Sequence, residues 1–206
     1  MRIRPFLGSV RGLYLVAVLL LLLPVYSSCA PAAAGKAPPI GSVLPDVTMK
    51  DYAGQEHTLS KLKGKIVVLD FCSQECPFSR GIDKDITALA KTYAPKGVVF
   101  LGVDSHKSTP PDEIKEYAAK IKIPFPILKD VGNKYADALG ATRTPEIYVL
   151  DKDLKLAYHG AYDDRKGPEK KAEKHYVKEA LDSLLAGEPV KTPKVKAWGC
   201  TIKRAQ

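Results

Sequence analysis

Long apolar runs are scarce in this sequence of 206 residues. The longest, Leu13–Leu23, has 11 residues, and a stable membrane-spanning helix needs about 20. A permanent membrane span is therefore the weaker interpretation of this run. The positive charges before it, on Arg2, Arg4 and Arg11, and the small polar residues after it are typical of an export signal. We expect residues 1–28 to be a signal peptide.

The end of this signal offers two cleavage points. Small residues precede Cys29 as in bacterial lipoproteins, so a cut there would leave a lipidated cysteine that holds the protein at a membrane. A cut within the alanine-rich residues 30–34 would release a soluble protein. We favour the first. After the signal peptide we expect a flexible tether at 29–42, one folded domain at 43–187 and a tail at 188–206.

Basic patches with interleaved aromatic residues are absent, although the formal net charge is +9. Lysines alternate with acids, as in KKAEKHYVKEALDSLL, which favours a solvated basic surface over nucleic-acid binding. We expect no nucleic-acid partner and no cofactor, and the oligomeric state stays open. Tyr162–Lys166 contains two adjacent acids, and we interpret it as a solvated loop rather than a cation site.

Cysteine is also scarce, and the pair Cys-x-x-Cys is missing. Of the four cysteines, Cys29 lies at the end of the signal, and Cys72, Cys76 and Cys200 follow it. A disulfide framework uses cysteines in pairs. An odd number beyond the signal therefore leaves at least one thiol reactive, lipidated or transiently paired.

Buried strands and amphipathic helices alternate along the rest of the chain. Residues 65–71, KIVVLDF, form a continuous apolar run that is typical of a central strand covered on both faces. Residues 77–93 then show apolar positions at helical spacing. A small hairpin is expected before the central strand, at 47–59. The later elements are expected in this order: a strand at 97–104, a helix at 108–122 with Thr109 as its N-cap, a strand at 126–128, a helix at 131–139, a hairpin at 145–160 and a helix at 170–185. This order predicts an α/β layer architecture.

Cys76 lies where the central strand gives way to the helix. A cysteine at the first turn of a helix faces unsatisfied backbone N–H groups and the positive end of the helix dipole, and both favour the nucleophilic thiolate. Asp70 lies six residues earlier in an otherwise apolar strand, where a carboxylate needs a partner or stays protonated. We therefore interpret Cys76 as a candidate nucleophile and Asp70 as a buried acid.

Three stretches surround this cysteine region: GSVLPDVTMKDYAGQEHTLSKLKGKIVVLDF before it, and GVVFLGVD and ATRTPEIYVLDKD after it. Through them, from about residue 39 to 185, the chain resembles the thioredoxin superfamily. It is most similar there to exported thiol-disulfide oxidoreductases and to the peroxiredoxin-like branch, the redoxins of AhpC/TSA type. The resemblance implies a thioredoxin-like α/β fold, with a central mixed β-sheet flanked by helices and an N-terminal hairpin extension.

The resemblance also implies a reaction and a site. Cys76 would attack protein disulfides, or a peroxide in antioxidant chemistry, and Asp70 would exchange protons with the active-site thiols. Thr144-Pro145 resembles the cis-proline loop, whose backbone faces the reactive cysteine. The substrate groove would be formed by Pro77, Phe78, Thr144 and Pro145.

A second thiol must then release Cys76 from the mixed disulfide. Ser79 stands where the family has its resolving cysteine, so the role would pass to Cys72 or Cys200. Cys72 is near in sequence, and a bridge needs Cα atoms within about 7 Å. Cys200 lies in the tail, which Trp198 could pin to the domain. We place Cys72 first.

Two other functions stay open. A peroxidase is the nearest, although peroxiredoxins place their cysteine in a Pro-x-x-x-Thr-x-x-Cys pattern at the position of Ser79; Arg80 or Arg143 could steady the thiolate.

CSQECP also has the Cys-x-x-x-Cys-Pro pattern of thioredoxin-fold copper chaperones, in which Cys72 and Cys76 would bind Cu(I). Those chaperones place a histidine where this chain has ATRTP, and we expect no metal site. The dispersed histidines are expected to be surface or core residues: His57, His106, His159 and His175.

Overall fold

The apolar run at residues 65–71 becomes the middle of the sheet. It forms β3 (Ile66–Cys72), whose residues are buried as far as Phe71. β3 pairs in parallel with β4 (Val98–Asp104) and antiparallel with β7 (Glu146–Leu150). Burial on both faces explains why this strand is continuously apolar and not alternating.

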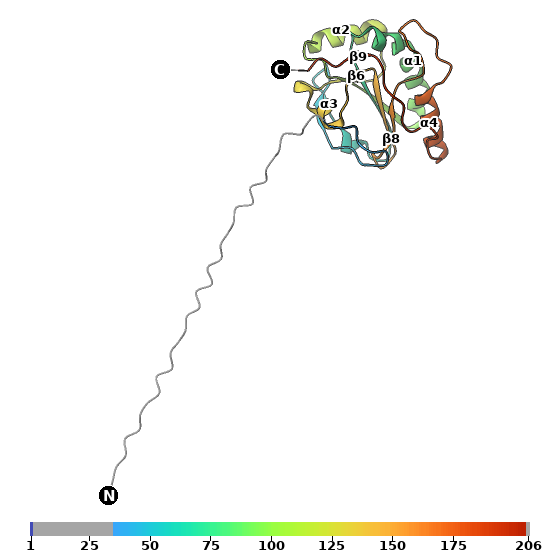
Figure 1. Cartoon of the computed structure of the whole chain (residues 1–206). Helices are drawn as coiled ribbons and strands as arrows, with labels where there is room; N and C mark the ends of the chain where they lie inside the picture. The colour runs from blue at the N-terminus through green and yellow to red at the C-terminus, as the bar shows by residue number, and fades with distance from the viewer. Residues whose placement is uncertain (2–34, 205–206) are drawn as a thin grey trace. The chain divides into compact units, whose positions relative to one another are not determined.

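The computed structural model describes Met1 and residues 35–204. The predicted signal peptide beyond Met1, Cys29 and the first part of the predicted tether lie outside the described residues. The central sheet is five-stranded and mixed, with the order β5-β4-β3-β7-β8, and helices pack against it (Figure 1). The remaining helices and strands, in chain order, are β1 (Thr48–Lys50), β2 (Glu56–Thr58), α1 (Pro77–Tyr93), α2 (Pro111–Ile121), β5 (Ile127–Lys129), α3 (Lys134–Leu139), β6 (Arg143–Thr144), β8 (Leu156–Gly160), α4 (Tyr176–Ala186) and β9 (Cys200–Thr201), with short 3₁₀ turns at Leu59–Leu62, Ala94–Lys96 and Val131–Asn133.

The two largest apolar cores form because alternate residues of a strand point to opposite faces. Val68 and its neighbours on one face pack against α1 and α4. Val67 and Leu69 on the other face pack with residues of α3 and with Met49 of the β1–β2 hairpin. The predicted fold class, a mixed sheet flanked by helices with an N-terminal hairpin, is confirmed.

Two helices begin later than the sequence indicated. α2 begins at Pro111, and the hydroxyl of Thr109 donates to Glu75 instead of capping the helix. α4 begins at Tyr176 and not near residue 170, because the backbone N–H groups of Glu173 and Lys174 donate to the side chain of Asp164 in a loop. This local hydrogen bonding overrides the helix propensity of the charged residues there.

The interpretation of Tyr162–Lys166 as a solvated loop was wrong. Asp163 and Arg165 are buried, and the Arg165 guanidinium donates to the Gly81 carbonyl at 2.9 Å and to Asp85 at 2.5 Å. Its Nε also donates to Asp163 at 2.7 Å. The loop is therefore fastened to α1.

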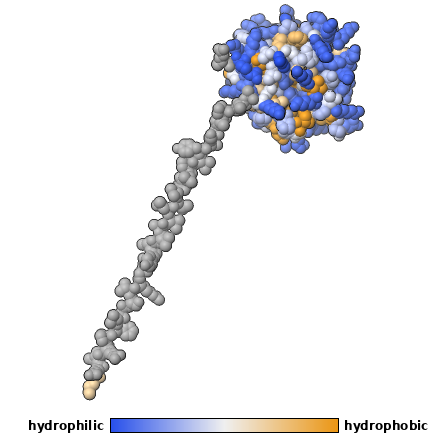
Figure 2. Space-filling view, in the orientation of Figure 1, coloured by the Kyte–Doolittle hydropathy of each residue, from blue (hydrophilic) through white to orange (hydrophobic). Residues whose placement is uncertain are grey.

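The described part of the predicted tether is hydrogen-bonded to the domain. Gly35 donates to the Asp137 carbonyl at 2.8 Å, and Gly41 donates to the Leu156 carbonyl at 2.7 Å. Among the described residues, no helix has the length and apolar character that crossing a membrane requires. In Figure 2, hydrophilic side chains surround several smaller apolar areas on the face shown.

Candidate thiol redox site

Cys76 begins α1 by capping it. Its backbone is extended, and its sulfur accepts a hydrogen bond from the Ser79 N–H at 3.5 Å. Pro77 takes the first helical position, where the missing N–H has no cost. A Cys-Pro pair at the end of a strand therefore both starts the helix and holds the sulfur at its positive end. Only 1% of Cys76 is exposed.

The cis-proline loop covers this sulfur. The Thr144-Pro145 peptide bond is cis, as the resemblance implied, and the Cys76 thiol donates to the Thr144 carbonyl at 2.9 Å. Thr144 is fully buried. The structure thus brings together Cys76 and the expected loop, which lies 68 residues away in sequence.

Glu146 holds that loop in place, and the sequence analysis did not identify it. Its carboxylate accepts hydrogen bonds from the N–H groups of Thr142 at 2.8 Å and Arg143 at 2.9 Å. It also pairs with His159 at 2.7 Å. Burial alone would raise the pKa of Glu146, but these hydrogen bonds lower it. The available signal was an acid that opens an otherwise apolar strand, the same pattern that singled out Asp70.

Cys200 reaches the site from the tail. β9 pairs antiparallel with β6, and this places Cys200 opposite Thr144. The labels of β6 and β9 lie side by side in Figure 1. Burial, with a further contribution from the neighbouring Cys76, raises the pKa of Cys200 to about 11. Cys200 is therefore a protonated thiol at neutral pH, and the residue opposite it, Thr144, accepts the proton of the candidate nucleophile. Both cysteines are free.

The tail is fixed on both sides of Cys200. Trp198 packs edge-on against Phe78 of α1, with ring centroids 5.3 Å apart, which agrees with the predicted role of Trp198. On the other side Ile202 is buried in a core, and Lys203 forms an ion pair of 2.9 Å with Glu75, the residue before Cys76. Arg143, one of the two arginines considered for the thiolate, donates to Thr201 of the tail at 2.8 Å.

Cys72 has different neighbours. It ends β3 and packs with Ile114, Ala118 and Ile127, near α2. Burial and the charges of Asp70 and other nearby carboxylates raise its pKa well above the usual range. The structure therefore groups Cys76 with Cys200, and Cys72 with Asp70.

Asp70 is buried beside a cavity of about 20 Å³, which has room for one water molecule. Its Oδ1 has no hydrogen-bond partner within the described part of the chain. Burial, with a further contribution from the charge of Asp83, raises the pKa of Asp70 to about 8. Ser79 lines the same cavity, and its N–H is the group that donates to Cys76. Ser79 thus lies between the cavity beside Asp70 and the sulfur of Cys76.

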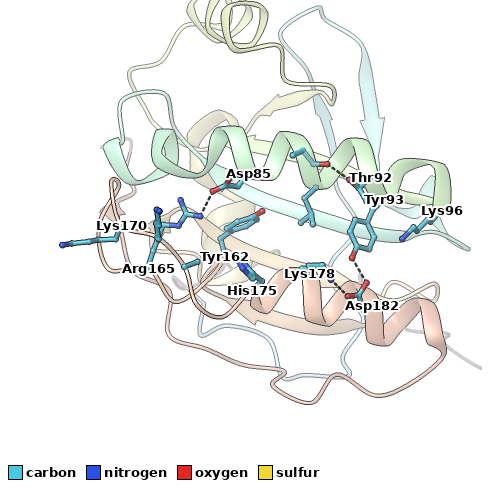
Figure 3. A pocket seen from close by; sticks show the side chains of 14 residues that line it. Asp85, Thr92, Tyr93, Lys96, Tyr162, Arg165, Lys170, His175, Lys178 and Asp182 are labelled. Carbon is cyan, nitrogen blue, oxygen red and sulfur yellow. Dashed lines mark hydrogen bonds and ion pairs between the residues drawn. The ribbon is translucent and has the colours of Figure 1, made fainter.

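A wider pocket of about 690 Å³ lies between α1 and α4, away from the thiols (Figure 3). Two of its cations are paired with acids, Arg165 with Asp85 and Lys178 with Asp182 at 2.7 Å, and three further lysines line it: Lys96, Lys170 and Lys171. Over residues 35–204, no group of three or more His, Cys, Asp and Glu side chains is arranged to hold a metal ion.

A mixed sheet of this order, with a cysteine capping the first long helix opposite a cis-proline, defines a thiol protein of the thioredoxin-like class. The chain belongs to the AhpC/TSA family, whose model matches residues 40–159. The resemblance inferred from the sequence is confirmed.

Relatives support both branches of that resemblance. The chain is 34% identical over 139 residues to a chloroplastic peroxiredoxin Q of Sedum lineare, a match that covers 61% of this chain and 72% of that one. It is 30% identical over 124 residues to the thiol-disulfide oxidoreductase ResA of Geobacillus thermodenitrificans, a match that covers 57% of this chain and 66% of that one. The match to the wheat peroxiredoxin Q covers only 61% of that protein. An uncharacterized conserved protein of Geobacillus kaustophilus has a similar structure, with a TM-score of 0.76 and 31% identity, covering 81% of this chain and 93% of that one.

Proposed function

We propose that this protein is a thiol-disulfide oxidoreductase in which Cys76 is the nucleophile and Cys200 the resolving thiol. The observation that carries the proposal is the pairing of Cys200 with Thr144, the residue whose carbonyl accepts the Cys76 thiol proton. A family of redox proteins and a relative named as a thiol-disulfide oxidoreductase support it.

The reaction proceeds in two exchanges. The Cys76 thiolate attacks a disulfide RSSR, forms the mixed disulfide between Cys76 and one RS group, and expels the other as a thiolate. Cys200, once deprotonated, then attacks the Cys76 sulfur and expels the second RS group. Two electrons pass from the two cysteines to RSSR, and two protons accompany the two released thiols. Run in reverse, the same steps oxidise a substrate dithiol.

Cys200 is the better resolving thiol on geometry. It lies opposite Thr144, whose carbonyl accepts the proton of Cys76, whereas Cys72 packs with Ile114 and Ile127 near α2. This proposal reverses the order of the two candidates that the sequence favoured.

Asp70 is proposed as the proton reservoir of the site. Because its pKa is raised to about 8, it holds a proton at neutral pH and can exchange it near its working range. Its cavity adjoins Ser79, which contacts Cys76 through its N–H. A water in this cavity would connect the carboxyl with the thiol side of α1.

A thiol peroxidase is the second candidate, favoured by the family and by the peroxiredoxin Q relatives. In that case the Cys76 thiolate attacks the O–O bond of a hydroperoxide and becomes a sulfenic acid while an alcohol or water leaves. Cys200 then forms the same disulfide and releases water. The copper alternative gains no support, because Cys72 and Cys76 have different surroundings.

Steady reduction of cystamine and of hydrogen peroxide by the purified protein, with a dithiol as final reductant, tests the proposal. Turnover of cystamine that is lost in Cys76→Ser and kept in Cys72→Ser supports it. Faster turnover of peroxide than of cystamine would favour the peroxidase, and turnover that persists in Cys76→Ser would refute both.

The proposal also places the protein outside the cytoplasm, with protein thiols or disulfides as partners and a lipid on Cys29. Support comes from the positive residues and the apolar run Leu13–Leu23 of the predicted signal. The mass of the protein purified from a bacterial membrane fraction is expected to equal a chain that begins at a diacylglyceryl-modified Cys29. A chain that begins within residues 30–34 would contradict the anchor.

A further inference from the structure

The edge of β6 beside Cys76 is occupied by the chain's own C-terminal segment, residues 193–204, which we name the strap. The strap first follows β8, where the Val195 N–H donates to the His159 carbonyl at 3.1 Å. It then crosses β6, where Cys200 pairs with Thr144. An exposed strand edge is the usual place for an extended polypeptide to bind, by adding one more strand.

We propose that the strap competes with polypeptide substrates for this edge, so that the reduced enzyme reacts with small disulfides while a polypeptide disulfide enters only after the strap lifts. This deepens the proposed function and rests on it. The two substrate classes differ in what must move. A small disulfide needs only a local shift at Cys200 to reach Cys76, but an extended polypeptide needs the backbone edge of Thr144.

Close contact at Gly199 shows that the strap is seated in the site. A Cβ at Gly199 would lie 2.2 Å from the Thr144 carbonyl oxygen and 3.2 Å from the Pro145 ring. Gly199 also has φ +147, a conformation that strongly favours glycine. Any larger residue would separate the strap from β6, which makes this position a direct probe of closure.

Apart from Ile202, which is buried in the core, the attachments of the strap around β9 are short or partly exposed. β9 has only two residues, and the ion pair beside it, Lys203 with Glu75, has side chains that are 59% and 33% exposed. Glu75 also accepts hydrogen bonds from Ser108 at 3.1 Å and Thr109 at 3.2 Å. Segments with exposed hydrogen bonds and short strands open at far lower cost than the core. The ion pair thus fastens the strap beside β9, and the Lys203 charge acts on Cys200, the thiol of the second exchange, and not on the first attack by Cys76.

Lys203→Glu tests this proposal because it places two carboxylates in contact while both cysteines remain. The rate of Cys76 mixed-disulfide formation is measured with two probes: cystamine, and a short extended peptide whose cysteine is disulfide-linked to cysteamine. The expected result is a peptide rate that rises about tenfold, which corresponds to about 1.4 kcal/mol, and a cystamine rate that changes less than about threefold. Lys178→Glu, which alters an exposed ion pair on α4, is the matched control and should change neither rate.

Gly199→Ala gives an independent variant, with Gly187→Ala as control. Gly187 has a positive φ of +74 but open space around its Cβ position, so its substitution places an alanine at a positive φ without displacing the strap. Gly199→Ala should raise the peptide rate and speed amide hydrogen exchange at Ile202, and Gly187→Ala should do neither. Equal increases for both probes, or unchanged peptide rates in both strap variants, would overturn the proposal. Loss of the proposed function itself is distinguishable, because cystamine would then react equally well with Cys76→Ser.

Discussion

Thr144 and Cys200 face each other across the two-residue pair of β6 and β9. The Thr144 carbonyl also accepts the proton of the Cys76 thiol at 2.9 Å. One residue of the cis-proline loop therefore positions the candidate nucleophile and the candidate resolving thiol at once. A Cys76–Cys200 bond, as proposed, would tie the tail to α1.

The buried carboxyl of Asp70 predicts a stability that falls as the pH rises. Its pKa is about 8 in the folded protein, against an ordinary value of 3.8. Between these values the folded state holds a proton that the unfolded state has released, so each increase in pH favours unfolding. Asp70→Asn removes this penalty. The free energy of unfolding of the variant, relative to wild type, should rise by up to about 1.4 kcal/mol per pH unit across that window and level off above about pH 8.

Urea unfolding of both proteins at several pH values between 5 and 9 measures this difference. Asp46→Asn is the control, because hydrogen bonds with Ser60 lower the pKa of Asp46. Its contribution to stability is lost only as the pH falls through that low folded-state pKa, so it should give a constant difference above pH 5. A difference for Asp70→Asn that is equally flat would show that this carboxyl is ionised in the folded protein.

The sequence predicts the centre of the fold well. Residues 77–93 were expected to form a helix and do so with the same bounds, because their apolar positions repeat at helical spacing and a Cys-Pro pair marks the start. The continuous apolar run of β3 likewise located the strand that precedes Cys76. Local patterns suffice where one element buries one continuous surface.

The pairing of the tail with β6 could not be predicted in this way. β9 has two residues, too few to show any periodicity, and its register depends on the tertiary contacts of Trp198 and Ile202. The pairing of Glu146 with His159 could not be predicted for the same reason, since His159 lies on a neighbouring strand. Proximity in sequence placed Cys72 first, although contacts across the sheet group Cys76 with Cys200.

Glu146→Gln should weaken both the fold and the site. It removes the charge that accepts hydrogen bonds from Thr142, Arg143 and His159 in a buried setting. We expect a loss of about 2–3 kcal/mol in the free energy of unfolding and slower disulfide formation, because the cis-proline loop loses its support. Urea unfolding and the rate of thiol loss measure the two effects. The control is Glu56→Gln, because Glu56 and its partner Lys50, 4.0 Å away, are both exposed. This variant should change the free energy of unfolding by less than about 0.5 kcal/mol. An equal loss in both variants would contradict the role of Glu146 in supporting the loop.

Arg165→Met tests the buried loop at Tyr162–Lys166. The substitution leaves Asp163 buried without its cationic partner and frees the Gly81 carbonyl. We expect a loss of about 3–5 kcal/mol in the free energy of unfolding, as for a buried ion pair that loses one member. Lys178→Met removes an exposed partner of Asp182 and should cost less than about 1 kcal/mol. Similar midpoints of thermal unfolding for the two variants would be inconsistent with a buried network.

Peptide mass mapping after brief exposure to cystamine or hydrogen peroxide tests the central claim most directly. The account predicts a peptide in which Cys76 is linked to Cys200, formed by wild type and by Cys72→Ser, and replaced in Cys200→Ser by a Cys76 mixed disulfide or sulfenic acid. A bridge between Cys72 and Cys76, or a Cys200 that stays free while Cys76 is oxidised, would contradict it.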